Sequence, residues 1–133
     1  MAACILIVDD DDTICALLTD VLTLFGHATR CAMCCTEGIA AINNAPPDLV
    51  LLDLKLPDGT GWTVYEAMQA QPALRCIPVV ILTGDLDEVP ADAGPETHCL
   101  TFLEKPFSVK TLKRTIDQHM TASHSAQAET RRA

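Results

Sequence analysis

The feature that most constrains this chain is a set of three apolar runs, Ile5–Val8, Leu49–Leu52 and Ile77–Leu82. Aliphatic runs without polar alternation are typical of strands that are buried on both faces of a parallel sheet. Two weaker strand signals occur at Ala28–Ala32 and Leu100–Glu104. The chain is therefore expected to contain five strands of one parallel sheet.

Segments with the three- and four-residue spacing of amphipathic helices separate these strands. The expected helices run from Asp12 or Thr13 to the stop at Gly26, over Glu37–Asn44 with Thr36 as cap, over Trp62–Gln71, and from the cap Ser108 onward. The side chains expected to face inward in the last helix are Val109, Leu112, Ile116 and Met120. Strands and helices that alternate over short connections predict a doubly wound α/β fold, with helices on both faces of the sheet.

The segment Asp85–Cys99, where this alternation requires a fourth helix, departs from the pattern. It carries Pro90, Gly94 and Pro95 and has little apolar periodicity. A proline inside a helix costs about 3 kcal/mol. The fourth helix is therefore expected to be short, displaced or absent.

Composition limits the domain organisation and the classes of partner. With 133 residues, 49% of them hydrophobic, the chain is expected to form one domain over residues 1–120. Residues 121–133 lack an apolar period and are expected to be a disordered tail or the start of a linker. The net charge of −9 argues against direct nucleic-acid binding, which requires a basic face. No apolar run approaches the ~20 residues of a membrane span and no leader peptide is recognised, so a cytoplasmic protein without membrane contact is expected.

The chain has seven cysteines, an odd number, and two of them, Cys34 and Cys35, are adjacent. This pattern is a poor disulfide framework, and the chain is large enough to fold on its core alone. Free thiols in a reducing compartment are therefore expected. The spacing Cys31-x-x-Cys34 leaves a redox-sensitive pair open as an alternative.

Polar side chains follow the apolar strands at the points where they end. Asp9 and Asp10 follow the first strand, Asp53 the third, Thr83 the fourth and Lys105 the fifth. The carboxyl ends of parallel strands meet at one edge of the sheet, which is where open α/β folds bind ligands. We therefore expect these five side chains to converge on one site.

The charges of this site predict its chemistry. Two carboxylates ~4 Å apart repel by roughly 4 kcal/mol at an effective dielectric constant of ~20, so a shared proton or a cation is required. Three aspartates and one lysine leave a charge that one divalent ion would cancel. Oxygen ligands with few protein contacts favour Mg²⁺. An ionised aspartate is also a competent nucleophile for phosphoryl transfer, which makes an acyl phosphate.

Four sequence motifs resemble those of one known family. They are ILIVDDD (Ile5–Asp11), LVLLDLKLPDGTG (Leu49–Gly61), VVILTG (Val79–Gly84) and FLEKPF (Phe102–Phe107). In this order and with these separations, they resemble the response-regulator receiver domain of two-component signalling, including its chemotaxis regulators. The resemblance covers Cys4–Met120 and implies a flavodoxin-like, five-stranded parallel sheet with strand order 2-1-3-4-5.

The resemblance also implies roles for the residues at the strand ends. Asp53 matches the phosphoacceptor, and Asp9 and Asp10 match the acidic pair that holds Mg²⁺, with Asp10 the more direct ligand. The backbone carbonyl of Lys55 would supply a further metal ligand. Lys105 matches the lysine that contacts a phosphoryl oxygen, and Pro106 would follow a cis peptide bond.

Three further residues match the family's switch. Thr83 matches the hydroxyl that turns inward to bind a phosphoryl oxygen, and Phe102 matches the aromatic residue that responds to this movement. Gly84 fits a place where only a small residue admits the phosphoryl group. Phosphorylation would thus be read out on the face around the last strand.

The function implied is that of a phosphoacceptor response regulator. Asp53 would take a phosphoryl group from a phosphohistidine of a sensor kinase or a histidine phosphotransfer protein. The domain would catalyse its own phosphorylation and dephosphorylation without being a stand-alone enzyme. Its output would be a downstream protein effector or a lost C-terminal output domain.

Several alternatives remain open on the sequence. The fold could serve as a phosphorylation-independent interaction module. A Mg²⁺ phosphohydrolase is disfavoured because Lys55 stands where that class has a second aspartate. Asp11 and Asp12 are expected to cap the first helix, and Phe102 could be plain core packing. An EF-hand calcium loop is excluded because its glycine and terminal glutamate are missing.

A second departure from the family pattern concerns Lys55, two residues past Asp53. Asp85 stands two residues past Thr83 and is a possible partner for it. We expect a Lys55–Asp85 pair to cover part of the site and to tune the hydrolysis of the acyl phosphate.

Overall fold

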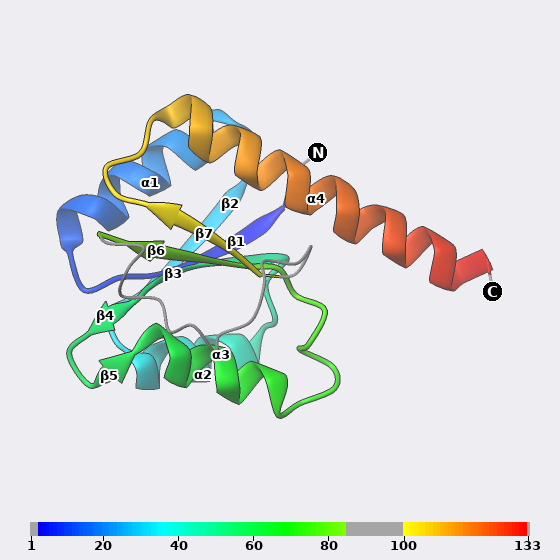
Figure 1. Ribbon diagram of the computed structural model, residues 1–133, viewed down its shortest axis with the longest axis horizontal. Coiled ribbons are helices and arrows are strands. Elements are labelled where there is room, and N and C mark those ends of the chain that lie inside the picture. Colours follow the sequence, from blue (N-terminus) through cyan, green and yellow to red (C-terminus); the bar gives the residue numbers. More distant parts are fainter. Residues whose placement is uncertain (1–2, 85–99, 133) are drawn as a thin grey trace.

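The computed structural model describes residues 3–84 and 100–132, with side chains through Met120. Its elements, in chain order, are β1 (Cys4–Val8), α1 (Asp12–Leu24), β2 (Ala28–Ala32), α2 (Cys35–Asn44), β3 (Leu49–Asp53), β4 (Lys55–Leu56), β5 (Gly59–Thr60), α3 (Gly61–Gln69), β6 (Val79–Thr83), β7 (Leu100–Glu104) and α4 (Val109–Arg132) (Figure 1). The predicted fourth helix and Asp85 lie outside the described residues. Each of the five predicted strands is present.

The sheet has five parallel strands in the order β2-β1-β3-β6-β7. The two short strands β4 and β5 form a separate antiparallel hairpin in the connection after β3. When the hairpin strands are not counted, β6 and β7 are the fourth and fifth strands of the chain. The observed order is then the predicted 2-1-3-4-5. The doubly wound, flavodoxin-like α/β fold is therefore confirmed.

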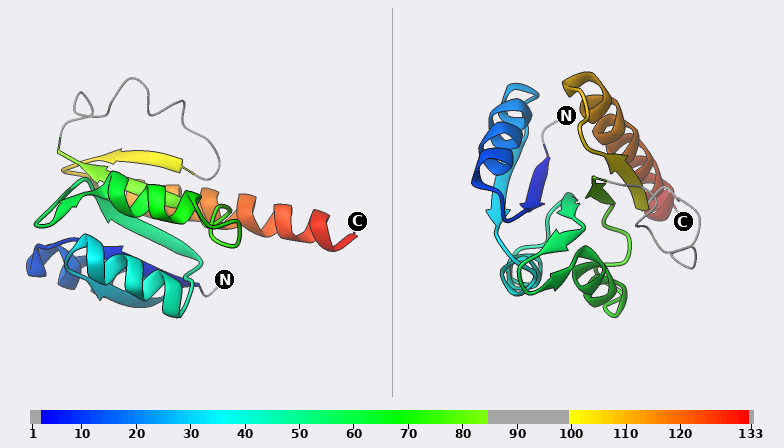
Figure 2. Two further views of the ribbon diagram at one scale, coloured as in Figure 1. Left: turned by 90° about the horizontal axis from the view of Figure 1, so that it is seen from below. Right: turned by 60° about the vertical axis from the view of Figure 1, so that its left-hand side comes forward.

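The helices cover the two faces of the sheet in pairs. Helices α1 and α4 lie on one face, and α2 and α3 lie on the other (Figures 1 and 2). Alternate residues of the central strands face these two layers: Ile5 and Ile7 pack with α1 and α4, whereas Leu6 and Val8 pack with α2 and α3. Because both faces are covered, the central strands are fully buried, which explains their unbroken apolar sequence.

Side chains next to the helix starts cap two of the helices. Asp11 caps α1 by accepting hydrogen bonds from the backbone N–H groups of Thr13 and Ile14, as predicted. Ser108 caps α4, since its Oγ accepts from the Thr111 N–H at 3.0 Å. Thr36 does not cap α2, because the helix begins one residue earlier at Cys35 and Thr36 lies in its first turn.

Helix α4 differs from the prediction in two ways. It continues through Arg132, although disorder was predicted after Met120. The reason is local: residues 121–132 contain no glycine or proline that would end the helix. At its start, Val109 was predicted to face inward but is exposed, because it lies in the first turn, before the helix reaches the core at Leu112. The domain boundary near residue 120 stays a prediction.

Within the part of the chain that the structure describes, no helix combines the length and apolarity needed to cross a bilayer.

Candidate functional site

Four strands bring the predicted site residues to one edge of the sheet. Asp9 directly follows β1, Asp53 and Thr83 are the last residues of β3 and β6, and Lys105 directly follows β7. The parallel register carries these four strand ends to the same edge. The strand ends therefore meet at one edge of the sheet, as expected from the sequence.

The three aspartates and the lysine are close together. One carboxylate oxygen from each of Asp9, Asp10 and Asp53 lies within 4.8 Å of the other two. The ammonium Nζ of Lys105 lies 3.4 Å from Oδ2 of Asp9 and 3.5 Å from Oδ1 of Asp53. Asp9 is buried, Asp10 is exposed and Asp53 is half-buried, so the cluster opens to solvent on the side of Asp10.

Backbone contacts fix the position of Asp9. Its N–H donates to the carbonyl oxygen of Ala32 at 3.0 Å, which extends the pairing of β1 with β2 beyond Val8. Its Oδ1 accepts from the N–H of Asp11, and its carbonyl oxygen accepts from the thiol of Cys15 on α1. The buried carboxylate is thus held by both neighbouring elements.

Burial and crowding make Asp53 hard to ionise. Burial, followed by the neighbouring charge of Asp9, raises the pKa of Asp53 to about 6. Lys105 and the backbone N–H of Lys55 act in the opposite direction but do not cancel this effect. A cation placed among the carboxylates would favour the ionised, nucleophilic form of Asp53.

The donor set fits a hard divalent cation. It consists of carboxylate oxygens only, and one of its members is exposed, so bound water could complete the coordination. Mg²⁺ prefers this combination of a few carboxylates and several waters. Asp9, Asp10 and Asp53 are the residues that would hold it.

Thr83 and Lys105 are joined through the backbone at the end of β6 and β7. The N–H of Lys105 donates to the carbonyl oxygen of Thr83 at 2.7 Å. Thr83 is buried, and the Lys105–Pro106 peptide bond is cis, as the family resemblance implied. This hydrogen bond links the ends of the two neighbouring strands.

Phe102 lies on β7 within an aromatic group that the sequence did not indicate. Its ring lies edge-on to Trp62 of α3, with the centroids 6.0 Å apart, and Trp62 makes a similar contact with Tyr65. Phe102 is half-buried against the core layer of α2 and α3. It is therefore both a packing residue and a candidate for the switch.

The remaining predicted site residues are only partly placed. Lys55 begins β4 and is exposed, and its N–H lies 3.5 Å from Oδ1 of Asp53. Among the described residues, a Cβ atom on Gly84 would meet no atom within 4 Å, so their packing does not require glycine there. The metal-binding role of the Lys55 carbonyl, the space-keeping role of Gly84 and the Lys55–Asp85 pair stay predictions.

Sequence reasoning missed the structural role of Asp58 in the β4–β5 hairpin. Its carboxylate accepts from the backbone N–H groups of Cys35 and Thr36 at 2.7 and 3.1 Å, and from the Thr36 hydroxyl at 2.9 Å. These hydrogen bonds hold the pKa of Asp58 well below its usual range. Asp58 therefore caps α2 from the connection that follows Asp53. The only sequence signal was an aspartate in a turn, which does not identify its distant partner.

Comparison with known proteins identifies the family of this fold and site. The family sequence model of the response regulator receiver domain matches residues 5–117 of this chain. The DNA-binding response regulator MtrA of Mycolicibacterium paratuberculosis is 37% identical over 108 residues, which are 81% of this chain and 47% of MtrA. The chain thus spans about half the length of the curated relatives that it matches.

Solved structures agree with this comparison. NtrX of Brucella abortus superposes with a TM-score of 0.83 at 30% identity, covering 98% of this chain and 30% of NtrX. A putative response regulator of Chloroflexus aurantiacus superposes with a TM-score of 0.81 at 30% identity, covering 91% of this chain and 99% of that protein. With the strand-end cluster of Asp9, Asp10, Asp53 and Lys105 in place on this fold, the chain belongs to the response regulator receiver domain family of two-component signalling.

Proposed function

We propose that Asp53 is the phosphoacceptor and that it takes its phosphoryl group from a phosphohistidine in a Mg²⁺-dependent reaction. The observation that supports this most is the placement of Lys105, whose ammonium lies between the carboxylates of Asp9 and Asp53. A cation in that position neutralises charge on a group transferred to Asp53. The donor is a sensor histidine kinase or a histidine phosphotransfer protein, and the domain supplies the catalytic groups.

The transfer itself needs few protein groups. An oxygen of Asp53 forms a bond to phosphorus, the bond from phosphorus to the donor's imidazole nitrogen breaks, and the imidazole leaves with that electron pair. Lys105 pairs with a phosphoryl oxygen in place of Asp9 or Asp53. Asp9, Asp10 and Asp53, with the carbonyl of Lys55, would hold Mg²⁺. When bound, the metal neutralises phosphoryl charge and favours ionised Asp53.

The switch follows from the new charge at Asp53. A phosphoryl group adds a charge of about −1.5 to −2 and three strong acceptor oxygens. Thr83 satisfies one of them by turning its hydroxyl toward Asp53, and Gly84 leaves room for the group. Because Lys105 is bonded to the backbone of Thr83, the ends of β6 and β7 move together. Phe102 then repacks, and the face around β7 binds its partner.

That partner is a downstream protein effector or an output domain of a longer protein. MtrA is a DNA-binding response regulator by name, and this chain matches 47% of it. We propose that the receiver itself makes no direct contact with nucleic acid, in keeping with the chain's net charge of −9, and that it acts in the cytoplasm.

Incubation with acetyl phosphate and Mg²⁺, followed by intact-mass measurement, tests this function. We expect one adduct of about 80 Da that is absent in Asp53→Asn and absent when EDTA replaces Mg²⁺. Asp20→Asn is the matched control, because Asp20 is an exposed residue of α1, and it should be labelled like the wild type. An unlabelled wild type would instead favour a phosphorylation-independent interaction module, and turnover of phosphate esters would favour a hydrolase.

A further inference from the structure

We propose that Cys15 and Cys31 form a peroxide-sensitive thiol pair that closes to a disulfide between α1 and β2. The two residues are 16 positions apart in the sequence and belong to different elements. The pair lies beside the acidic site but shares no residue with it. It is a modification site that the phosphoacceptor function does not require.

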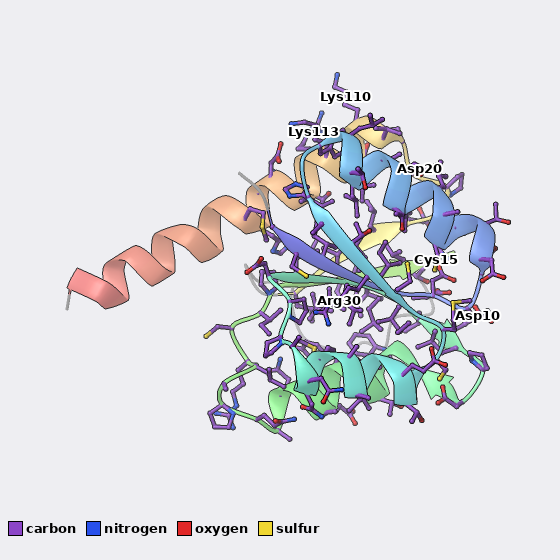
Figure 3. The ribbon with its side chains drawn as sticks, turned by 180° about the vertical axis from the view of Figure 1, so that it is seen from behind. Asp10, Cys15, Asp20, Arg30, Lys110 and Lys113 are labelled. Carbon is purple, nitrogen blue, oxygen red and sulfur yellow. The ribbon has the colours of Figure 1, made fainter. Side chains whose placement is uncertain are left out.

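The alternation of side chains along β2 directs Cys31 toward α1. Arg30 points to the opposite face, where its guanidinium donates to carbonyl oxygens at the end of α2 (Figure 3). Ala32 also packs on the α2 side. Cys31, between them, pairs in register with Ile7, whose side chain faces α1 and α4. Cys31 therefore lies on the α1 side of the edge strand.

Contacts from α1 place the Cys15 thiol next to Cys31. Thr19, one helical turn after Cys15, has its Oγ1 3.6 Å from the Sγ of Cys31. The Cys15 thiol donates to the carbonyl oxygen of Asp9 at 3.2 Å, and the N–H of Asp9 is bonded to Ala32, the neighbour of Cys31. Cys15 and Thr19 lie one turn apart on the same face of α1, so both side chains are directed toward the strand position of Cys31. Figure 3 shows Cys15 between α1 and β2.

This arrangement differs from the pair that the sequence spacing indicated. Cys34 precedes α2, which covers the other face of the sheet, and the adjacent Cys35 packs in the core layer of α2 and α3. Cys15, Cys31 and Cys34 are not joined in a disulfide, so either pairing is a response to oxidation rather than part of the fold. The geometry favours Cys15 over Cys34 as the partner of Cys31.

Exposure determines the order of the two chemical steps. Cys31 is exposed, whereas Cys15 is buried. Peroxide in the solvent therefore reaches the sulfur of Cys31 first. With hydrogen peroxide as oxidant, the sulfur of Cys31 attacks one oxygen, the O–O bond breaks, and a sulfenic acid and one water form. The sulfur of Cys15 then attacks that sulfenic sulfur, the S–O bond breaks, and the hydroxyl leaves as water with the proton of Cys15.

The disulfide would also reach the acidic site, a consequence that rests on the proposed function. Oxidation removes the Cys15 proton, so the carbonyl oxygen of Asp9 loses its thiol donor. Asp9 is one of the proposed Mg²⁺ ligands. Within the described residues, it would after oxidation be positioned only by its hydrogen bonds with Ala32 and Asp11 and by Lys105. We expect the oxidised protein to accept phosphoryl groups from acetyl phosphate at least several-fold more slowly, with recovery after reduction by dithiothreitol.

Peroxide titration of the full chain tests the thiol pair. We expect the oxidised protein to be about 2 Da lighter than the reduced protein before alkylation, to take up two alkyl groups fewer on alkylation, and to give a Cys15–Cys31 peptide on non-reducing digestion. Cys31→Ser and Cys15→Ser should each lose this cross-link, whereas the matched control Cys34→Ser should keep it. A cross-link of Cys31 to Cys34, or two thiols that oxidise independently to sulfinic acids, overturns the proposal.

Phosphorylation is measured separately from disulfide formation, so that a failure of the thiol-pair proposal can be told from a failure of the proposed phosphoacceptor function. If the cross-link forms but the oxidised and reduced proteins are labelled at the same rate, the link to Asp9 is wrong. If the reduced protein is not labelled at all, the proposed function fails, while the mapped disulfide still decides whether the thiol pair is correct.

Discussion

Gly61 lies so close to the backbone of Asp53 that a Cβ atom on it would be 2.6 Å from the Asp53 carbonyl oxygen. Gly61 is the first residue of α3, and its N–H donates to the carbonyl oxygen of Leu54 at 2.8 Å. The start of α3 is therefore pressed against the strand that carries the proposed phosphoacceptor. This contact gives the first of five testable predictions.

Gly61→Ala should destabilise the fold and disturb Asp53. The added methyl meets backbone rather than a flexible side chain, and overpacking of this kind costs about 1 to 3 kcal/mol. Urea unfolding would measure the loss, and labelling with acetyl phosphate should be slower. Gly84→Ala is the control for stability, since its Cβ would meet no atom of the residues that the structure describes within 4 Å. Equal unfolding midpoints for the two variants would contradict the close contact at Gly61.

Lys105→Met should weaken both the site and the fold. Without the ammonium 3.5 Å from Asp53, the repulsion with Asp9 is uncompensated, so the pKa of Asp53 should rise further and stability should fall. We expect a loss of about 1 kcal/mol without Mg²⁺ and labelling at least about tenfold slower. Carbon NMR titration and urea unfolding measure these effects. Lys113→Met removes a half-exposed ion pair with Asp117 and a cation–π contact with Phe25, so it should have a small effect on stability and none on labelling.

The stability of the metal-free protein should depend on the ionisation of Asp53. Its pKa is about 6 in the folded protein and about 3.9 in an unfolded chain, so the folded state binds the proton more tightly. The stabilisation from this carboxyl is therefore present below about pH 4 and is lost as the pH rises through about 6. In EDTA, Asp53→Asn should become more stable than the wild type by about 2 to 3 kcal/mol above about pH 7. Mg²⁺ should reduce this difference, and a difference that does not vary with pH would contradict the raised pKa.

Asp58→Asn should lower the melting temperature at neutral pH. The amide cannot replace a carboxylate that accepts from two N–H groups and a hydroxyl at the start of α2. Because the pKa of Asp58 is lowered by folding, its stabilisation is present above about pH 4 and is lost as the pH falls further. The two melting curves should therefore converge in acid. Asp20→Asn, on the exposed face of α1, should match the wild type at every pH.

Trp62 should report the switch by fluorescence. It is the only tryptophan of the chain, and its ring lies 6.0 Å from that of Phe102. If Phe102 repacks when Asp53 carries a phosphoryl group, beryllofluoride with Mg²⁺ should change the Trp62 emission in the wild type but not in Asp53→Asn. Phe102→Leu should reduce the change while leaving labelling of Asp53 intact. If beryllofluoride with Mg²⁺ left the emission of the wild type unaltered, Phe102 would be a packing residue of the core and not part of the switch.

The sequence by itself determined the layout of the sheet and its functional edge. Unbroken apolar runs such as Leu49–Leu52 occur where both faces of a strand are buried, so they indicate parallel strands covered by helices. The polar residues that end these runs must then meet at one edge. This reasoning brought Lys105 next to Asp9 although the two are 96 positions apart.

Only the tertiary structure decided which side chains become partners on neighbouring elements. Leu17 and Leu18 share the apolar repeat of α1, yet Leu17 is 55% exposed and Leu18 is buried. Thr36 was predicted to cap α2, but Asp58 does so from the hairpin after β3. Cys31 contacts Thr19 of α1, whereas its sequence neighbour Cys34 precedes α2 on the other face of the sheet. Periodicity fixes the face of an element on which a residue lies, whereas its partner depends on how the elements pack, and packing is a property of the folded chain.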